Sequence, residues 1–168
     1  MLIRGSSFEI RPVVENELAS VLEVYRQCED FLALGPEPQA SMKMVLRDIE
    51  ISKEGGGIFC GIYDFEGEMI GVIDFVPSGF EGNPHHAFIS LLMIALPFRT
   101  MGLGAEVVRL VEDEIVKSAQ VKSILLAVQV NNQAAIKFWQ RNGYKIVGGP
   151  ELQPDRTTVF HLRKEVIR

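Results

Sequence analysis

The stretch from Phe88 to Ile115 constrains the fold of this chain most, because its hydrophobic period changes at a glycine turn. It begins as an apolar run, Phe88 to Leu96, which is too short to span a membrane and indicates a buried strand that ends at Pro97. After the turn, apolar residues recur at helical spacing, and charged residues take the opposite side. The apolar positions are Leu103, Val107, Leu110, Val111 and Ile115. The stretch therefore predicts a strand, a tight turn and an amphipathic helix.

The turn between these elements, Arg99 to Gly104, predicts an anion site. The first backbone N–H groups of a helix lack internal partners, and the helix dipole places partial positive charge there. Gly102 and Gly104 let a ligand approach the bare backbone, and Arg99 adds a positive charge beside it. The ligand that suits such a turn is a phosphate or a pyrophosphate.

The spacing of the glycines separates this turn from the common nucleotide-binding motifs. A Walker loop requires Lys followed by Ser or Thr, which the turn lacks, and Val107 stands where a Rossmann fingerprint has its third glycine. What fits is Arg99-x-x-Gly102-x-Gly104, which resembles the acyl-CoA pyrophosphate loop, Q/R-x-x-G-x-G/A, of the GNAT superfamily of N-acyltransferases. For this motif alone, a glycine turn that binds nothing is the alternative, as is a nucleotide-binding domain of another kind.

A second motif strengthens the resemblance. The apolar strand Ile124 to Val130 is followed by Asn132, which suits a helix N-cap, and Gly143 stops the helix that comes next. The GNAT pattern here is N-x-x-A-x-x-x-Y-x-x-x-G-F, and this chain has Asn132-x-x-Ala135-x-x-x-Trp139-x-x-x-Gly143-Tyr144. The two motifs cover Ser90 to Val147. The N-terminal half fits the family in element order only.

The other elements follow from periodicity and turn signals. We predict strands at Phe8–Pro12, Ile58–Asp64, Met69–Val76 and Thr157–Arg163 and from Tyr144 to Val147, helices at Glu15–Cys28 and from Met42 past Ile49, and a loop at Phe31–Pro38. The predicted order, βααβββαβαββ, is that of the GNAT fold. This is an α+β fold with a mixed, mostly antiparallel central sheet and helices on both faces.

Composition limits the remaining classes. A length of 168 residues, 47% of them hydrophobic, suits one domain, which we expect to occupy residues 1–168. The net charge of −5 disfavours nucleic acid as a partner, and neither a signal peptide nor a transmembrane run is visible. Cys28 and Cys60 have no metal-ligand spacing, so we expect reduced thiols, no metal and a cytoplasmic protein.

The resemblance implies that acetyl-CoA donates an acetyl group to an amine. The pantetheine arm would pair with backbone groups of the strand Ser90–Ala95 like an extra strand, and the glycine turn would hold the pyrophosphate. Carried onto this sequence, the cofactor-binding residues are Leu92, Ile94, Arg99, Thr100, Met101, Gly102, Leu103, Gly104, Ala105, Asn132, Ala135, Phe138 and Trp139. A backbone N–H near Ile94 would hold the thioester oxygen as charge develops on it.

The chain departs from the family at the residue that commonly protonates the leaving thiolate. That Tyr is replaced by Trp139, whose indole N–H is not a usable acid, so Trp139 is either a core aromatic or a cofactor contact. The thiolate then leaves unaided, or Tyr144 or Tyr63 substitutes. The departure also motivates an alternative function: an acyl-CoA-binding domain with little catalysis, which acts as a sensor or partner module.

The general base is predicted from strand parity. His86, Ser90 and Ile94 fall on one face of a regular strand, so His86 would accept the amine proton, through a water held with Ser90. The alternative is that His85 and His86 are solvated loop residues. Weaker candidates for the base are Asp74, Glu81 and Glu37.

The acceptor is an amine of a small molecule or a peptide, and a homodimer is compatible with the sequence. In the family, the first two helices and their loop usually form the acceptor wall. Here that region contains Phe31, Leu32, Leu34 and Met42, with Glu29, Asp30 and Glu37 around them. Acidic residues beside an amine site favour a cationic acceptor, although a solvated loop carries such charges as well.

Overall fold

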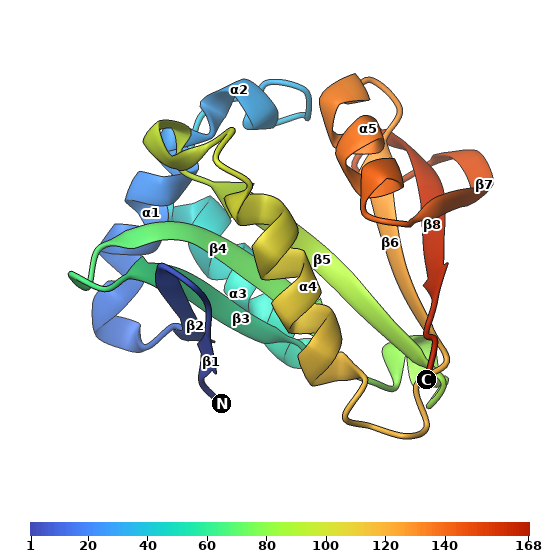
Figure 1. Ribbon diagram of the computed structural model, residues 1–168. Coiled ribbons are helices and arrows are strands. Elements are labelled where there is room, and N and C mark those ends of the chain that lie inside the picture. The colour runs from blue at the N-terminus through green and yellow to red at the C-terminus, as the bar shows by residue number, and fades with distance from the viewer.

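One twisted sheet runs through the whole of the computed structural model, which describes all 168 residues (Figure 1). The strands, in the spatial order β1-β2-β3-β4-β5-β6-β8-β7, are β1 (Ile3–Arg4), β2 (Phe8–Pro12), β3 (Ile58–Asp64), β4 (Met69–Val76), β5 (His86–Ile94), β6 (Ser123–Gln129), β8 (Thr158–Glu165) and β7 (Lys145–Leu152). All neighbours are antiparallel except β5 and β6, which are parallel. This is the predicted mixed, mostly antiparallel central sheet, and the predicted α+β fold class is confirmed.

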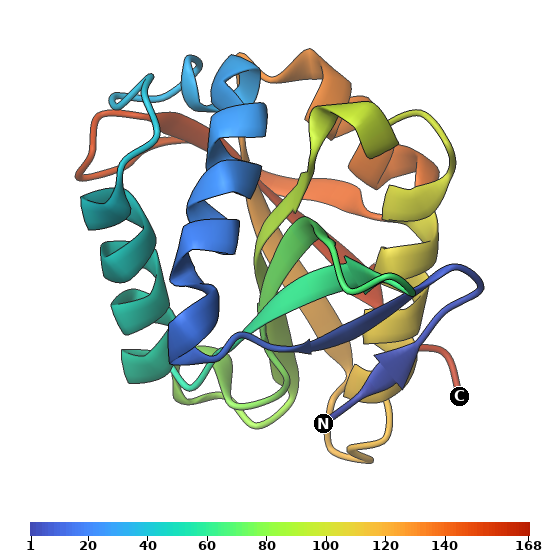
Figure 2. The same ribbon diagram turned by 90° about the vertical axis from the view of Figure 1, so that its left-hand side faces the viewer.

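Five α-helices cover the two faces of the sheet. They are α1 (Leu18–Gln27), α2 (Glu29–Leu32), α3 (Met42–Glu54), α4 (Leu103–Ile115) and α5 (Gln133–Arg141). Figure 2 shows α1 and α3 side by side on one face and α4 on the other. A core of 22 buried residues lies under α4 and α5, and a second core of 11 lies under α1 and α3. Both faces of the central strands are therefore buried, which explains why β4 is apolar nearly throughout.

Most predicted elements appear where periodicity placed them. The strands β2, β3 and β4 have the predicted bounds, since their ends are marked by Pro, Gly and charged turn residues. The Asn132 side chain caps α5 by accepting a hydrogen bond from Ala135 N at 3.0 Å. Gly143 follows that helix at a φ of 93°, a backbone conformation that favours glycine.

The structure corrects several predicted boundaries and adds one strand. The helix predicted from Glu15 begins as a 3₁₀ turn, Glu15–Glu17, before α1, and the predicted loop Phe31–Pro38 starts inside α2. The short edge strand β1 was not predicted, because two residues carry no measurable period. Tyr144 precedes β7 and does not belong to it, since its side chain turns into the core.

No helix is both long and apolar enough to cross a membrane.

One buried carboxyl group lies on the α1 and α3 face of the sheet. Asp74 of β4 is 5% exposed, and its Oδ1 accepts a hydrogen bond from Ser52 Oγ at 2.6 Å. No cation pairs with it, so burial raises its pKa to about 6, and the charge of Asp48 acts in the same direction. The folded protein therefore binds a proton at Asp74 at a pH where the unfolded chain does not.

We expect Asp74→Asn to remove a pH dependence of stability. Because the folded pKa is raised, the contribution of Asp74 is fully present below about pH 4 and is lost as pH rises through 6. The unfolding free energy of the wild type should fall by about 2 to 3 kcal/mol more than that of the variant between pH 4 and 7.5. Urea denaturation of both proteins across this range measures the difference. Parallel curves would show that Asp74 stays ionised in the fold.

Candidate functional site

The site begins where β5 and β6 separate. They pair only over His86–Phe88 and Ser123–Leu125, and beyond these residues they diverge toward α2 and α5 (Figure 1). On the opposite edge of β5, Ala95 N donates to Ile70 O of the β3–β4 side at 2.9 Å. Because alternate residues of an antiparallel strand turn to opposite edges, Leu92 and Ile94 direct their N–H and C=O groups into the gap. The gap is therefore lined by backbone groups that face no partner strand.

The glycine turn stands at the end of β5 and leaves the start of α4 uncapped. Gly102 has a φ of 76°, and no side chain caps the helix. The first hydrogen bond within α4 runs from Glu106 N to Gly102 O, so the N–H groups of Leu103, Gly104 and Ala105 have no partner in the helix. The predicted combination of free N–H groups and a positive helix end is present in the structure.

The two glycines serve different purposes. A Cβ on Gly102 would meet nothing within 4 Å, so this position requires glycine for its backbone conformation and not for space. A Cβ on Gly104 would stand 3.2 Å from the ring of Phe138 on α5, so glycine at this position allows a close approach of the two helices. Thr100 has a positive φ of 64°, and Met101 is 71% exposed. The turn is thus strained at one non-glycine residue and open to solvent.

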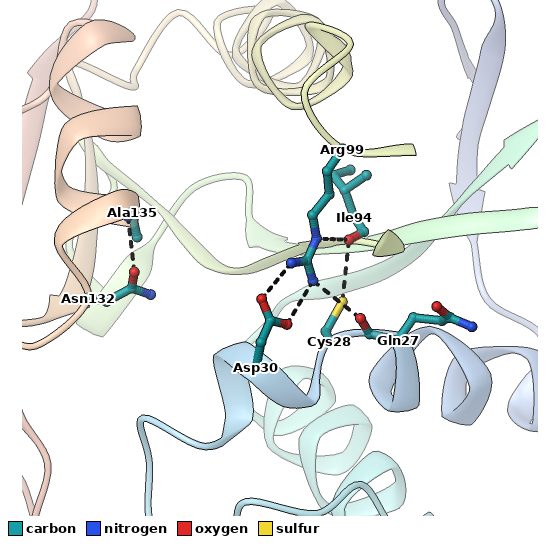
Figure 3. A network of polar contacts seen from close by, with 7 residues as sticks. All are labelled: Gln27, Cys28, Asp30, Ile94, Arg99, Asn132 and Ala135. Carbon is teal, nitrogen blue, oxygen red and sulfur yellow. Dashed lines mark hydrogen bonds and ion pairs between the residues drawn. The ribbon is translucent and has the colours of Figure 1, made fainter. Parts of the chain in front are cut away.

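Arg99 points away from the turn that was predicted to use its charge. Its Nη1 and Nη2 donate to Asp30 at 2.6 and 3.1 Å, and its Nε donates to Ile94 O at 2.9 Å (Figure 3). Cys28 Sγ also donates to Ile94 O, at 3.4 Å. The guanidinium lowers the pKa of Asp30 by hydrogen bonding. In this structure Arg99 therefore joins β5 to α2 and leaves the anion site to the backbone of α4.

The short helix α2 forms a bridge over the mouth of the gap. Asp30 of α2 pairs with Arg99, which follows β5 in the chain. Leu34, which follows α2, accepts a hydrogen bond at its carbonyl oxygen from Asn131 Nδ2, which follows β6, at 3.1 Å. Figure 3 shows Asn132, at the start of α5, across the opening from Arg99. Ala135 and Phe138 of α5 are half-buried against the core beside it. The structure thus brings Asn132, Ala135 and Phe138 to the opening that Arg99 borders, with the Asn132 oxygen engaged as a helix cap.

Trp139 and Tyr144 lie in the core. Trp139 is 8% exposed, and its indole packs edge-on against the rings of Phe138 and Tyr144 at 5.1 and 5.2 Å. Tyr144 is 1% exposed, its hydroxyl donates to Glu112 Oε2 at 2.7 Å, and burial raises its pKa. Tyr63 donates its hydroxyl to Glu17 on the far side of the molecule. Neither tyrosine presents an acidic proton at the gap, so neither supplies the acid expected of it.

The predicted face shared by His86 and Ile94 is wrong, because a β-bulge interrupts β5. Phe75 pairs with Ile89 and Asp74 with Leu91, so Ser90 has no partner on β4. The extra residue reverses the parity: Ile89 lies in the core under α4, and Leu92 and Ile94 pack against that same core. Ser90 is exposed at the bulge.

His86 also lies at the wrong end of the strand. It pairs with Ser123 where β5 and β6 are still together, and roughly 26 Å of strand separates it from Ile94. Phe88, on the same face as His86, stacks on Phe80 at 4.0 Å between ring centroids. The geometry therefore gives His86 no path to an amine held at the end of β5.

Sequence reasoning missed a cavity of about 360 Å³ beside the gap. It lies between the segment after α2, the end of β6 and the β7–β8 turn, and its lining residues include Gly35, Gln129, Asn131 and Asp155. The alternation in β6 could have drawn attention to Gln129: Ile124, Leu126 and Val128 lie in the core under α4, so Gln129 falls on the opposite face.

Comparison with known proteins identifies the class to which this geometry belongs. The model of the acetyltransferase (GNAT) family matches residues 18–144. N-alpha-acetyltransferase 50 of Danio rerio is 31% identical over 65 residues, which are 39% of each protein. The match thus spans about two fifths of the length of the curated relatives.

Solved structures agree over nearly the whole chain. An acetyltransferase from Thermus thermophilus superposes with a TM-score of 0.78 at 20% identity, over 99% of this chain and 100% of the other. The spermidine N-acetyltransferase of Vibrio cholerae, in complex with CoA and spermine, gives a TM-score of 0.69 at 15% identity, over 96% of both chains. At these identities the likeness concerns the fold.

The role of the Asp30–Arg99 pair can be tested without activity. Asp30 is largely exposed, so we expect Asp30→Ala to change the unfolding free energy by no more than about 1 kcal/mol. Amide hydrogens of residues 29–34 should nevertheless exchange faster, because α2 loses its ion pair with Arg99. Glu23→Ala is the matched control, since it breaks an exposed pair with Arg26 inside α1. Unchanged exchange in Asp30→Ala would show that α2 is held by other contacts.

Proposed function

We propose, because the chain belongs to the GNAT family of acetyltransferases, that it transfers an acetyl group from acetyl-CoA to an amine. The observation that carries this proposal is the uncapped start of α4 beside the unpaired edge of β5. The free N–H groups at the start of α4 suit an anion, and the unpaired edge of β5 suits an extended chain with amide groups. Acetyl-CoA carries both in one molecule, as a pyrophosphate and a pantetheine arm.

The residues of the opening would contact successive parts of acetyl-CoA, from the pyrophosphate to the pantetheine arm. The N–H groups of Leu103, Gly104 and Ala105 would hold the pyrophosphate, and the positive φ of Gly102 keeps that backbone exposed. Leu92 and the N–H of Ile94 would pair with the pantetheine arm, since Ile94 O is already taken by Arg99 and Cys28. Asn132, Ala135, Phe138 and the exposed Met101 and Thr100 would border the cofactor. Arg99 acts here as a positioning residue through Asp30.

The reaction then needs few side chains. The amine nitrogen bonds to the thioester carbon, the C–S bond breaks, and the amine proton passes to water as the thiolate leaves. A backbone N–H near Ile94 would donate to the developing oxyanion. A thiol whose pKa lies near 8.5 leaves without an acid at neutral pH, which suits a site where Trp139 replaces the usual Tyr. Ser90, which is exposed at the bulge, would hold that water.

The acceptor class follows from relatives only in outline. The Danio rerio relative is named as an N-alpha-acetyltransferase, and the Vibrio cholerae structure holds spermine. We infer an amine of a small molecule or of a peptide for this chain. Cys28 and Cys60 are buried, unpaired thiols, which supports a reducing compartment such as the cytoplasm.

Gly102→Glu should abolish cofactor binding. A negative side chain at the start of α4 would repel the pyrophosphate, and we expect the affinity for acetyl-CoA to fall by at least about 100-fold. Gly79→Glu is the matched control, because Gly79 has a φ of 75° and open space like Gly102, but lies in a remote turn. Calorimetry on both variants decides. If the folded Gly102→Glu and Gly79→Glu variants bind acetyl-CoA with equal affinity, the pyrophosphate does not bind at this turn.

Trp139→Phe separates packing from catalysis. Because the indole fills the core, the unfolding free energy should fall by about 1 to 3 kcal/mol. Turnover per folded molecule should change far less than the roughly 10²-fold loss expected for a general acid. Denaturation and thiol release across a panel of amines measure the two effects. A large loss of turnover at unchanged stability would assign Trp139 to the reaction.

Acetyl-CoA binding with no turnover on any amine would favour the sensor function.

A further inference from the structure

A single contact joins the N-terminal hairpin to the first turn of α4. Ser6 lies in the turn between β1 and β2, which Figure 2 shows beside α4. Its backbone N–H donates to Glu106 Oε1 at 2.8 Å, and its hydroxyl donates to Glu106 Oε2 at 2.9 Å. Hydrogen bonds to a charged group are stronger than those between neutral groups. One residue of the hairpin therefore holds both oxygens of the Glu106 carboxylate, although 100 positions separate the two residues in the chain.

The hydrophobic core fixes the position of Ser6. Gly5 N donates to Phe8 O at 2.8 Å and so closes the turn. Phe8 is fully buried, and a Cβ on Gly5 would stand 2.6 Å from its ring, so the backbone of the turn lies against that ring. The two donors of Ser6 are therefore held in place by the core, independently of their contact with Glu106.

This contact draws the Glu106 carboxylate to one side of α4. Gly104 faces Phe138 of α5, which borders the opening. Glu106 instead lines a separate cavity of about 300 Å³, which lies between the β1–β2 turn and the start of α4 and is also lined by Ser6 and Leu103. Glu106 is the acidic residue of the first turn of α4. The side of this turn that faces α5 therefore has no carboxylate from the turn itself.

A released Glu106 would compete with an anion at the start of α4. Helical side chains lean toward the N-terminus of their helix, and the helix dipole favours a carboxylate there. The free carboxylate would thus lie beside the N–H groups of Leu103, Gly104 and Ala105, which have no partner in the helix. It would accept hydrogen bonds from groups that otherwise serve the ligand, and its charge would repel an anion.

We propose that Ser6 is a positioning residue that acts through Glu106: it holds the carboxylate away from the start of α4 and so keeps that site open to a pyrophosphate. The inference rests on the proposed function, in which acetyl-CoA supplies the pyrophosphate. It goes further in assigning part of the donor affinity to the N-terminal hairpin. The contact does not involve the reacting groups at Ile94, so the affinity for the donor should depend on it and the rate of transfer from bound donor should not.

Ser6→Ala tests this role, because it removes one of the two hydrogen bonds and keeps the backbone donor. We expect the affinity for acetyl-CoA, measured by calorimetry at low ionic strength, to fall about 3- to 10-fold, and KM for acetyl-CoA to rise by the same factor at unchanged kcat. The deficit should shrink by at least half between about 20 and 300 mM salt, because salt screens the repulsion between exposed charges. A merely loosened helix start would weaken binding at every salt concentration.

A double-mutant cycle separates the charge of Glu106 from the packing of the hairpin. Glu106→Gln keeps the shape of the side chain and removes its charge, so this variant should bind acetyl-CoA at least as tightly as the wild type. In that background Ser6→Ala should change the affinity by less than about 2-fold. Ser6→Thr keeps both donors and should keep the wild-type affinity. Ser7→Ala is the matched control and should have no effect, because Ser7 lies in the same turn and lines the same cavity but is not bonded to Glu106.

Titration with inorganic pyrophosphate tests the inference without acetyl transfer. Ser6→Ala should weaken pyrophosphate binding about as much as it weakens acetyl-CoA binding, and Glu106→Gln should restore it. This result supports the inference even if the protein acetylates no amine, in which case only the proposed function fails. If Ser6→Ala binds both ligands as tightly as the wild type, or loses the same affinity in the Glu106→Gln background, the inference is wrong and acetyl transfer is unaffected. If the wild type binds neither ligand, both are wrong.

Discussion

The site depends on the loss of one strand pairing. β5 and β6 share only three residue pairs before they separate, and past that point the backbone groups of Leu92 and Ile94 face no partner strand. A sheet interrupted in its middle is costly, because buried N–H and C=O groups require partners. The protein keeps the interruption open by turning β5 into α4 on one side and β6 into α5 on the other, so that two helix starts border the opening.

The charges around the opening are arranged so that the backbone at the start of α4, and not Arg99, is available to an anion. Arg99 is bound by Asp30 and by the carbonyl of Ile94, and its role is to fix the shape of the turn and the position of α2. The first turn of α4 then presents its N–H groups without a competing side-chain cap. Asn132 provides the contrast: its oxygen closes the start of α5, which makes that helix end a wall of the opening.

The proposed chemistry depends on which side chains the fold brings to the opening and which it keeps away from it. The hydroxyl of Tyr144 is used by Glu112, and Trp139 fills the core between α5 and β8, so neither aromatic is available as an acid. His86 lies at the start of β5, a whole strand length away from Ile94. Transfer from a thioester tolerates these losses, because the thiolate is a stable leaving group and water can take the proton.

The sequence alone determined the order and most bounds of the elements, because a period of 2 or 3.6 and its Gly, Pro and Asn punctuation are local properties. It also determined the glycine turn before α4, since the positive φ of Gly102 is a local property of the backbone. The direction of Arg99, the parity reversal at Ser90, the burial of Tyr144 and the contact of Ser6 with Glu106 were decided by the tertiary structure. Each of these depends on a partner far away in the chain, such as Asp30 for Arg99 or Glu112 for Tyr144, and periodicity carries no information about such partners.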